Sequence, residues 1–357
     1  MLNISQNFIE KHLYKRTIVS YLLFPFSIIY LAITSIRRSL YNKNILKCYS
    51  SNVKIVSIGN LTSGGSGKTP FIIFLANYLK NKGKKVGISH RGYKGAYEHT
   101  VHLISDEEGV FPLDTSAGDE ANLIARNCYG IPIIVGKNRT EAIKVLEDRF
   151  SLDYILLDDS FQHISVKHYY DFLLFNSINP LGNGFLIPAG ILRDSIGKIK
   201  YADCLVFTNA EKDYRIHRKF VKFNKPIFRC QYKAQAFIDT YTKREVPLSE
   251  IRNKRILLLS GIGTPDSFEY TIKQLGIDFI EHKKYPDHYA WDSRTELLQL
   301  EKEAIIKKLD FIIITEKDYY RHYNSPTFAT TTLYLKIKLY FHNRQLLEEE
   351  LRNKLMA

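Results

Sequence analysis

Cysteine is scarce in this sequence, and the few cysteines lie far apart. The chain of 357 residues has four, Cys48, Cys128, Cys204 and Cys230, and none belongs to a Cys-x-x-Cys pair. Zinc sites and disulfide frameworks depend on paired or closely spaced cysteines. The sequence therefore argues against a metal–thiolate site and a disulfide-stapled fold, and it predicts reduced thiols in a cytosolic compartment.

Internal repeats and low-complexity tracts are also absent from the sequence, which argues against a repeat array. The apolar content of 45% is ordinary for a globular protein with a buried core. A length of 357 residues is large for one compact domain, so we expect two lobes.

Acidic residues are too few to balance the basic ones. The chain has 51 Lys and Arg against 37 Asp and Glu, which gives a formal net charge of +14. Such a balance favours an anionic partner, namely nucleic acid, an acidic membrane surface or a phosphorylated substrate. The alternative is a source organism whose proteins are Lys-rich in general, because Lys, Asn, Ile and Tyr are all abundant here.

One hydrophobic segment, residues 18–36, is almost long enough to cross a membrane, but it contains a proline and several hydroxyl side chains. It lacks a small-residue cleavage site, which argues against a secretory signal. Basic pairs at 15–16 and 37–38 flank it. We expect a helix that lies in the cytoplasmic leaflet, with these pairs on anionic headgroups and Tyr21 and Tyr30 near the interface. The alternative is a buried helix.

Short apolar strands alternate with helical segments along the rest of the chain. The expected strands are 53–58, 85–89, 131–135, 154–157, 172–175, 205–207, 256–260, 311–314 and 333–339. The expected helices are 70–80, 119–128, 140–150, 266–275, 295–309 and 346–354. This alternation predicts an α/β fold with a mostly parallel sheet covered on both faces. The strand pattern lapses at 232–250, where we expect a boundary between lobes.

The strongest motif is a glycine-rich loop between the strand at 53–58 and the helix at 70–80. It reads Thr62-Ser63-Gly64-Gly65-Ser66-Gly67-Lys68-Thr69. Glycines let backbone N–H groups turn toward phosphates, and the next helix adds the positive end of its dipole. Lys68 can bridge the β- and γ-phosphates, and Thr69 can bind magnesium. The alternative is a flexible turn before a helix.

Two aspartates, Asp158 and Asp159, end the apolar strand at 154–157. Ligands of open α/β folds bind at the carboxyl edge of the sheet, where these side chains lie. Such an aspartate commonly holds magnesium opposite the threonine of the loop. The alternative role is to cap a helix.

Four weaker motifs follow turns or begin helices. They are Gly118-Asp119-Glu120, Pro286-Asp287-His288-Tyr289, Arg91-Gly92-Tyr93-Lys94 and Lys137-Asn138-Arg139. An acidic start of a helix is routine, and exposed basic loops are common. A histidine that an aspartate orients near a phosphate site could instead assist proton removal, and the basic turns could bind anions.

The order of these motifs resembles the tetraacyldisaccharide 4'-kinase family, from the hydrophobic N-terminus to about residue 320. The stretches that carry the resemblance are 57–61, 64–69, 91–93, 118–120, 158–163, 188–193, 261–263, 286–289 and 315–318. Each is modest alone, but the ordered set is specific. The sequence departs from the family pattern at Ser160, where Gly is frequent, and at Asp194, where Glu is common.

The resemblance implies a P-loop NTPase-like three-layer sandwich with a smaller second α/β lobe and an N-terminal hydrophobic helix. It implies an ATP- and magnesium-dependent kinase of lipid A biosynthesis, which phosphorylates the 4'-hydroxyl of a tetraacyldisaccharide 1-phosphate at the cytoplasmic face of the bacterial inner membrane. The corresponding divisions are a membrane-associated segment at 1–45, a P-loop kinase domain at 46–235 and a C-terminal lobe at 236–357.

The resemblance also assigns site residues. Asp119 is the base, assisted by His288, with Asp287 beside it. The residues assigned to the nucleotide are Thr62, Ser63, Gly64, Gly65, Ser66, Gly67, Lys68, Thr69, Arg139, Gln162 and Arg193. Those assigned to magnesium are Thr69, Asp158, Asp159 and Asp194.

Two other classes fit the sequence less well. A phosphate-loop GTPase or metallochaperone should have an Asn-Lys-x-Asp motif and an Asp-x-x-Gly switch, and the sequence has neither at the relevant places. A nucleic-acid enzyme should concentrate its basic and aromatic residues on one face, whereas the lysines here are spread along the chain. We therefore expect a lipid substrate and a membrane surface as partners, no nucleic acid and no protein partner.

Overall fold

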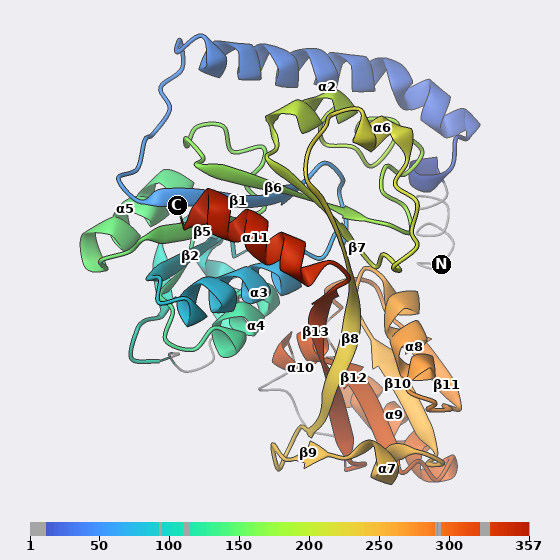
Figure 1. Ribbon diagram of the computed structural model, residues 1–357. Coiled ribbons are helices and arrows are strands. Elements are labelled where there is room, and N and C mark those ends of the chain that lie inside the picture. Colours follow the sequence, from blue (N-terminus) through green and yellow to red (C-terminus); the bar gives the residue numbers. More distant parts are fainter. Residues whose placement is uncertain are drawn as a thin grey trace.

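The computed structural model describes residues 12–92, 95–109, 111, 115–289, 291, 294–321 and 329–356. Tyr93 and Lys94, which belong to one of the basic motifs, lie outside the described residues. Figure 1 shows two lobes that stand side by side, joined by the long strands β8 and β13.

Within the described residues, a sheet of thirteen strands runs through both lobes in the order β11-β10-β12-β13-β8-β7-β6-β1-β5-β2-β4-β3, with β9 paired to β8. The strands are β1 Lys54–Asn60, β2 Val86–His90, β3 His102–Ser105, β4 Ile133–Val135, β5 Tyr154–Asp158, β6 Tyr170–Asn176, β7 Cys204–Thr208, β8 Ile227–Asp239, β9 Glu245–Val246, β10 Ile256–Ser260, β11 Glu281–Lys284, β12 Phe311–Thr315 and β13 Thr332–Phe341. The described strand pairs are parallel except β3 with β4, β8 with β13 and β8 with β9.

Helices cover both faces of this sheet. The α-helices are α2 Ile18–Asn42, α3 Lys68–Asn81, α4 Asp119–Asn127, α5 Arg139–Arg149, α6 Arg218–Val221, α7 Leu248–Ile251, α8 Pro265–Gln274, α9 Arg294–Ile306, α10 Glu316–Arg321 and α11 Arg344–Leu355. Three short 3₁₀ helices are η1 Ala96–His99, η2 Thr115–Ala117 and η3 Ile196–Tyr201.

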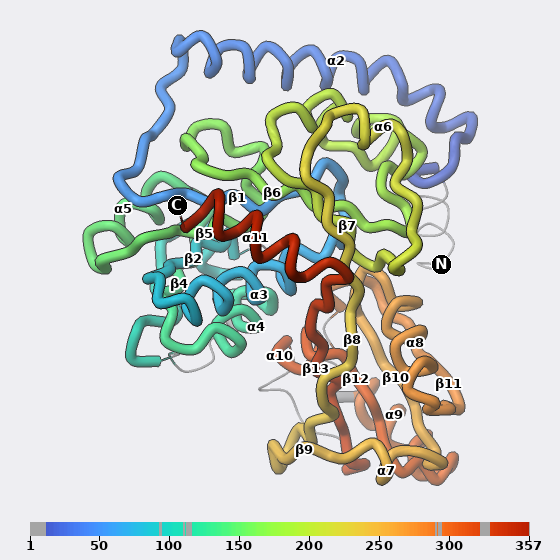
Figure 2. Tube along the Cα trace, viewed as in Figure 1, coloured from blue at the N-terminus to red at the C-terminus, as the bar shows by residue number. Residues whose placement is uncertain are grey.

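The first lobe, built on β1 to β7, has an apolar core on each side of its sheet. Residues of α3, α4 and α11 pack on one face, and residues of α5, η3 and α6 pack on the other. Figure 2 shows that α11, at the C-terminal end, returns from the second lobe and lies on the first beside α3. Burial of such apolar surface is the main stabilising force of the fold. These layers confirm the predicted three-layer α/β sandwich.

The second lobe, built on β10 to β13, repeats this arrangement on a smaller scale. Residues of α7 and α8 cover one face, and residues of α9 and α10 cover the other. The expected boundary at 235 and 236 falls inside strand β8, Ile227–Asp239, which belongs to both halves of the sheet. The division of the chain into domains therefore remains a prediction.

The strand β8 is the largest element that the sequence pattern did not predict. Its thirteen residues alternate apolar with polar side chains, and only three of them are buried. Continuous apolar runs mark strands that are covered on both faces, whereas β8 becomes more exposed where it crosses between lobes. The short strands β3 and β11 were also missed, because only two of the four residues of β3 are apolar and β11 has none.

The N-terminal helix α2 lies along the first lobe with its polar face inward (Figure 1). Its buried residues are Ser20, Ser27 and Arg38, whereas apolar side chains such as Leu22 are exposed. Tyr30 also turns its hydroxyl toward the body, where it donates to the Arg193 carbonyl at 3.1 Å, so its place near a membrane interface remains a prediction. The helix is long and apolar enough to cross a membrane, with a mean hydropathy of 1.9 and 11% of that stretch buried.

Candidate active site

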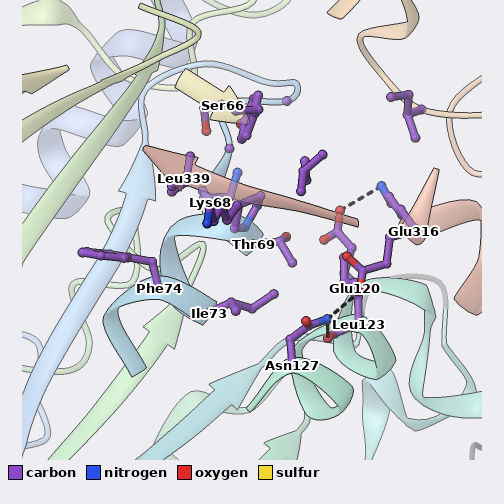
Figure 3. A pocket seen from close by; sticks show the side chains of 18 of the residues that line it. Ser66, Lys68, Thr69, Ile73, Phe74, Glu120, Leu123, Asn127, Glu316 and Leu339 are labelled. Carbon is purple, nitrogen blue, oxygen red and sulfur yellow. Dashed lines mark hydrogen bonds and ion pairs between the residues drawn. The ribbon is translucent and has the colours of Figure 1, made fainter. Parts of the chain in front are cut away.

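A cavity of about 1160 Å³ opens between the two lobes. The phosphate loop (residues 62–69), the ends of β2 and β5, and parts of α3 and α4 line it from the first lobe, and parts of α8, α10 and β13 line it from the second. Figure 3 shows Lys68 and Thr69 at one side of the cavity and Glu120 and Glu316 at the other. The cavity is therefore shared by the two lobes.

The phosphate loop has the backbone that its glycines predict. Gly64 and Gly67 have φ angles of 121° and 80°, in the region that disfavours side chains. A Cβ atom at Gly67 would lie 2.2 Å from the Tyr232 hydroxyl, so only glycine fits there. The Ser63 N–H donates to the Ile191 carbonyl at 2.7 Å, which ties the loop down. The loop thus presents the N-terminus of α3 to the cavity, a favourable place for phosphates.

Lys68, the first residue of α3, forms an ion pair with Asp159 at 3.5 Å. Arg193 donates two hydrogen bonds to the same carboxylate, at 2.7 and 2.9 Å. Burial acts to raise the pKa of Asp159, but these two cations outweigh it and hold the pKa well below its usual value. Asp159 therefore stays ionised and keeps Lys68 and Arg193 next to the loop.

Asp158 ends β5 and is 3% exposed. Its Oδ1 atom is buried and has no hydrogen-bond partner. A buried carboxylate oxygen without a partner is costly, and oxygen ligands of this kind suit magnesium. The carboxylate of Asp158 and a carboxylate oxygen of Glu120 lie within 4.8 Å of each other, beside a nitrogen of His90, so the two carboxylates fit a divalent cation.

Four residues predicted for this site are not among those that line the cavity: Asp119, Arg139, Gln162 and Asp194. Arg139 is buried behind it, where it donates to the Asp158 carbonyl at 2.6 Å. Gln162 donates to the Asn60 carbonyl at 2.9 Å, at the end of β1. Both therefore support the strand ends that carry the site.

Asp194 faces the N-terminal helix. Its carboxylate lies 3.7 Å from the Arg38 guanidinium of α2. Burial raises the pKa of Asp194, and Arg38 offsets this only in part. Asp194 therefore faces α2 and not the cavity, and its role as a magnesium ligand remains a prediction.

The acidic start of α4 meets a histidine and two cations of the second lobe. The Asp119 carboxylate lies 3.1 Å from His288 Nδ1, 2.7 Å from Arg321 Nη2 and 3.9 Å from Lys317 Nζ. Glu120 lies 2.9 Å from Lys317 Nζ. The structure thus brings together two predicted catalytic residues, Asp119 and His288, which belong to different lobes.

This network fixes the charge of Asp119. Burial acts to raise its pKa, but the hydrogen bond from His288 and the charges of Lys317 and Arg321 together hold the pKa well below its usual value. His288 has a φ angle of 63°, which is unusual for a side-chain-bearing residue and frequent at functional sites. Asp287 is more peripheral, at 3.8 Å from His288 Nε2 and 3.4 Å from Lys317.

The sequence did not single out three residues of the site: His90, Lys317 and Arg321. His90 directly follows the predicted strand at 85–89, a position that could have identified it. Lys317 belongs to a stretch that carried the family resemblance, and Arg321 lies one helical turn after it. The role of Lys317 and Arg321 becomes clear only in the folded structure, where they meet the carboxylates of the first lobe.

Comparisons with known proteins identify the family of this chain. The family model of LpxK, tetraacyldisaccharide-1-P 4'-kinase, matches residues 19–356. A tetraacyldisaccharide 4'-kinase of Halothermothrix orenii is 32% identical over 324 residues, which cover 84% of this chain and 82% of the relative. One of Syntrophus aciditrophicus is 30% identical over 331 residues, which cover 89% of this chain and 88% of the relative.

A solved structure gives the same result for the fold. The crystal structure of LpxK from Aquifex aeolicus in complex with ATP superimposes with a TM-score of 0.75 and 27% sequence identity. The match covers 95% of this chain and the whole of that chain. The P-loop NTPase-like fold and the kinase activity are therefore confirmed, and the family implies a lipid A precursor as substrate. The chain belongs to the tetraacyldisaccharide 4'-kinase family, the phosphotransferases of lipid A biosynthesis.

Proposed function

We propose that this chain transfers the γ-phosphoryl group of ATP to the 4'-hydroxyl of a tetraacyldisaccharide 1-phosphate, with the phosphate loop as the donor site and the Asp119–His288 pair as the proton acceptor. One observation carries this proposal. His288, which contacts Asp119, lines the same cavity as Lys68 and Thr69, from the opposite lobe. Donor and acceptor can therefore meet between the lobes.

The first chemical requirement is a group that accepts the proton of the sugar hydroxyl. A sugar hydroxyl is a poor nucleophile at neutral pH, so a positioned base must take its proton. The low pKa of Asp119 keeps its carboxylate ionised, but alone it makes that carboxylate a weak base. The contact of 3.1 Å to His288 Nδ1 supports proton transfer to the two groups as a coupled pair.

Charge neutralisation at the phosphates is the second requirement. Phosphoryl transfer depends mainly on positioning and on positive charge near the transferring group. Lys68 and Arg193, which Asp159 holds beside the loop, supply that charge. Ser66, whose hydroxyl is buried without a hydrogen-bond partner, is available to a phosphate oxygen.

Magnesium would be held by the Thr69 hydroxyl and the Asp158 carboxylate, with Glu120 within reach and Asp159 acting through water. The unpartnered Oδ1 of Asp158 supports this assignment. When bound, the ion supplies positive charge to the β- and γ-phosphates.

Membrane attachment through α2 follows from its outward apolar face. Ile18, Leu22 and Ile29 are 79%, 70% and 57% exposed, whereas the face toward the body is polar. A helix fixed along the protein in this way can lie in one leaflet, with basic flanks on anionic lipids. We place it at the cytoplasmic face of the inner membrane, where ATP is available.

Substitution of outward apolar residues of α2 by glutamate tests this attachment. Leu22→Glu and Ile29→Glu should release the protein into the soluble fraction of lysed cells while its thermal unfolding is unchanged. Ile306→Glu is the matched control, because Ile306 is 80% exposed in the second lobe. Membrane association that persists in both variants would place the attachment elsewhere.

The activity itself is tested with purified protein in detergent. ATP consumption should require the lipid A disaccharide precursor, and mass spectrometry should find one added phosphate at the 4'-position. Robust GTP hydrolysis without the precursor would contradict the proposed function.

A further inference from the structure

The last residue of β2, His90, is a buried histidine to which the proposed mechanism gives no role. It is 3% exposed and lines the cavity. Its Nε2 atom lies 3.1 Å from Asp158 Oδ2 and 3.7 Å from Glu120 Oε2. Its place beside two carboxylates raises the question of whether it binds a cation itself or acts on the carboxylates.

The contact of the other ring nitrogen of His90, Nδ1, distinguishes these two roles. The Gly92 N–H donates to His90 Nδ1 at 2.9 Å, so Nδ1 is an acceptor and the ring proton is on Nε2. A histidine that binds a metal through Nε2 instead donates from its other nitrogen, usually to a carboxylate or carbonyl. His90 is therefore arranged as a hydrogen-bond donor to Asp158 and not as a metal ligand.

The turn that fixes this tautomer has little freedom. Gly92 has a φ angle of 69°, and a Cβ atom at this position would lie 2.1 Å from Val135 Cγ1. The glycine can approach β4 closely for this reason, and its N–H is aimed back at the ring. The His90 ring thus has a fixed partner on each side.

Asp158 is held at two points as a result. Arg139 donates to its backbone carbonyl at 2.6 Å, and His90 Nε2 lies 3.1 Å from Oδ2, within reach of a hydrogen bond. Only Oδ1 is left without a partner, although it is buried. A carboxylate whose second oxygen is occupied offers one defined oxygen to a cation, and this is what orients a metal ligand.

We propose that His90 is a positioning residue, which holds the Asp158 carboxylate so that Oδ1 is presented to the divalent cation of the ATP site. This inference rests on the proposed role of Asp158 as a magnesium ligand. It concerns how the Asp158 carboxylate is oriented. The chemistry of phosphoryl transfer is assigned to the groups described above.

The test compares two substitutions of similar size. His90→Leu removes the donor, whereas His90→Gln keeps an N–H that can reach Asp158. Mn²⁺ is titrated into the full-length protein with a saturating non-hydrolysable ATP analogue, and electron paramagnetic resonance measures the free ion. We expect His90→Leu to weaken Mn²⁺ binding about 10- to 100-fold, as loss of a hydrogen bond behind a metal ligand commonly does, and His90→Gln to recover most of it.

Two further variants make the outcome decisive. Asp158→Asn should weaken Mn²⁺ binding at least as much as His90→Leu, and the double variant His90→Leu/Asp158→Asn should lose no more than Asp158→Asn alone, because His90 acts through Asp158. Thermal unfolding without metal separates this effect from loss of fold.

Three results would overturn the proposal: unchanged Mn²⁺ affinity in His90→Leu, a His90→Gln variant as weak as His90→Leu, or fully additive losses in the double variant. Unchanged affinity in Asp158→Asn would instead overturn the assignment of Asp158 as a ligand, and would remove the role of His90 with it.

Discussion

The two halves of the active site are built in different ways. The donor half is one contiguous loop of the first lobe, residues 62–69, whose backbone is fixed by glycines and by a strand and a helix at its ends. The acceptor half joins Asp119 of the first lobe to His288, Lys317 and Arg321 of the second. The donor half therefore depends on local backbone geometry, and the acceptor half depends on how the lobes meet.

The largest effect should come from the acceptor half. Asp119→Asn removes the carboxylate but keeps its size, and we expect turnover to fall about 10²- to 10⁴-fold, the usual contribution of a positioned base. ATP affinity should stay unchanged, because the phosphate loop lines the cavity whereas Asp119 does not. Steady-state kinetics and fluorescent nucleotide binding measure the two quantities. Loss of both together would mean that the halves are not separable.

Lys68→Met should affect the donor half. Removal of this charge from the phosphates should lower kcat/KM for ATP about 10²- to 10³-fold, and it should also weaken ATP binding, in contrast to Asp119→Asn. Lys302→Met, at an exposed position of α9, is the control. Unchanged nucleotide binding in Lys68→Met would contradict the assignment of the loop.

The loop backbone can be tested with a pair of glycines. Gly67→Ala forces a side chain toward Tyr232 at a positive φ angle, which should cost about 1–3 kcal/mol and weaken ATP binding accordingly. Gly65→Ala should have little effect, because nothing lies within 4 Å of its added Cβ. Equal ATP dissociation constants for both variants would show that loop strain does not matter.

The smallest effect should come from the contact between α2 and the first lobe. Ser27 donates to the Leu186 carbonyl at 2.7 Å and accepts from the Ala189 N–H at 3.2 Å. Ser27→Ala removes both bonds and should cost about 1 kcal/mol of unfolding free energy, seen as a lower midpoint in thermal unfolding. Ser39→Ala, at an exposed position of the same helix, should leave the midpoint unchanged. Equal midpoints would show that these bonds do not hold α2.

The contrast between the halves also explains what the sequence could predict. The phosphate loop, the aspartates after β5 and most strands and helices follow from local patterns, because glycine spacing and apolar runs have direct structural consequences. The contact between Asp119 and His288 joins residues that are 169 positions apart, and the contact with Arg321 spans 202. No local pattern encodes such pairs, so the family resemblance alone suggested the first, and Arg321 was missed.

Asp194 shows that the position of a residue in the sequence can also suggest contacts that the folded chain does not make. Its place after Arg193 suggested a role near the metal, but the chain turns there and Asp194 meets Arg38 of α2 instead. Neighbouring residues can thus serve different parts of the molecule, with Arg193 beside Asp159 and Asp194 beside the N-terminal helix.

The most direct test of the central claim is whether Asp119 and His288 act as one unit across the two lobes. Turnover is measured for Asp119→Asn, His288→Ala and the double variant, at saturating ATP and lipid precursor. Groups that act together lose little more when both are removed than when one is removed, so we predict that kcat of the double variant stays close to that of the weaker single variant. Losses that multiply, or a His288→Ala variant with normal turnover, would contradict the account.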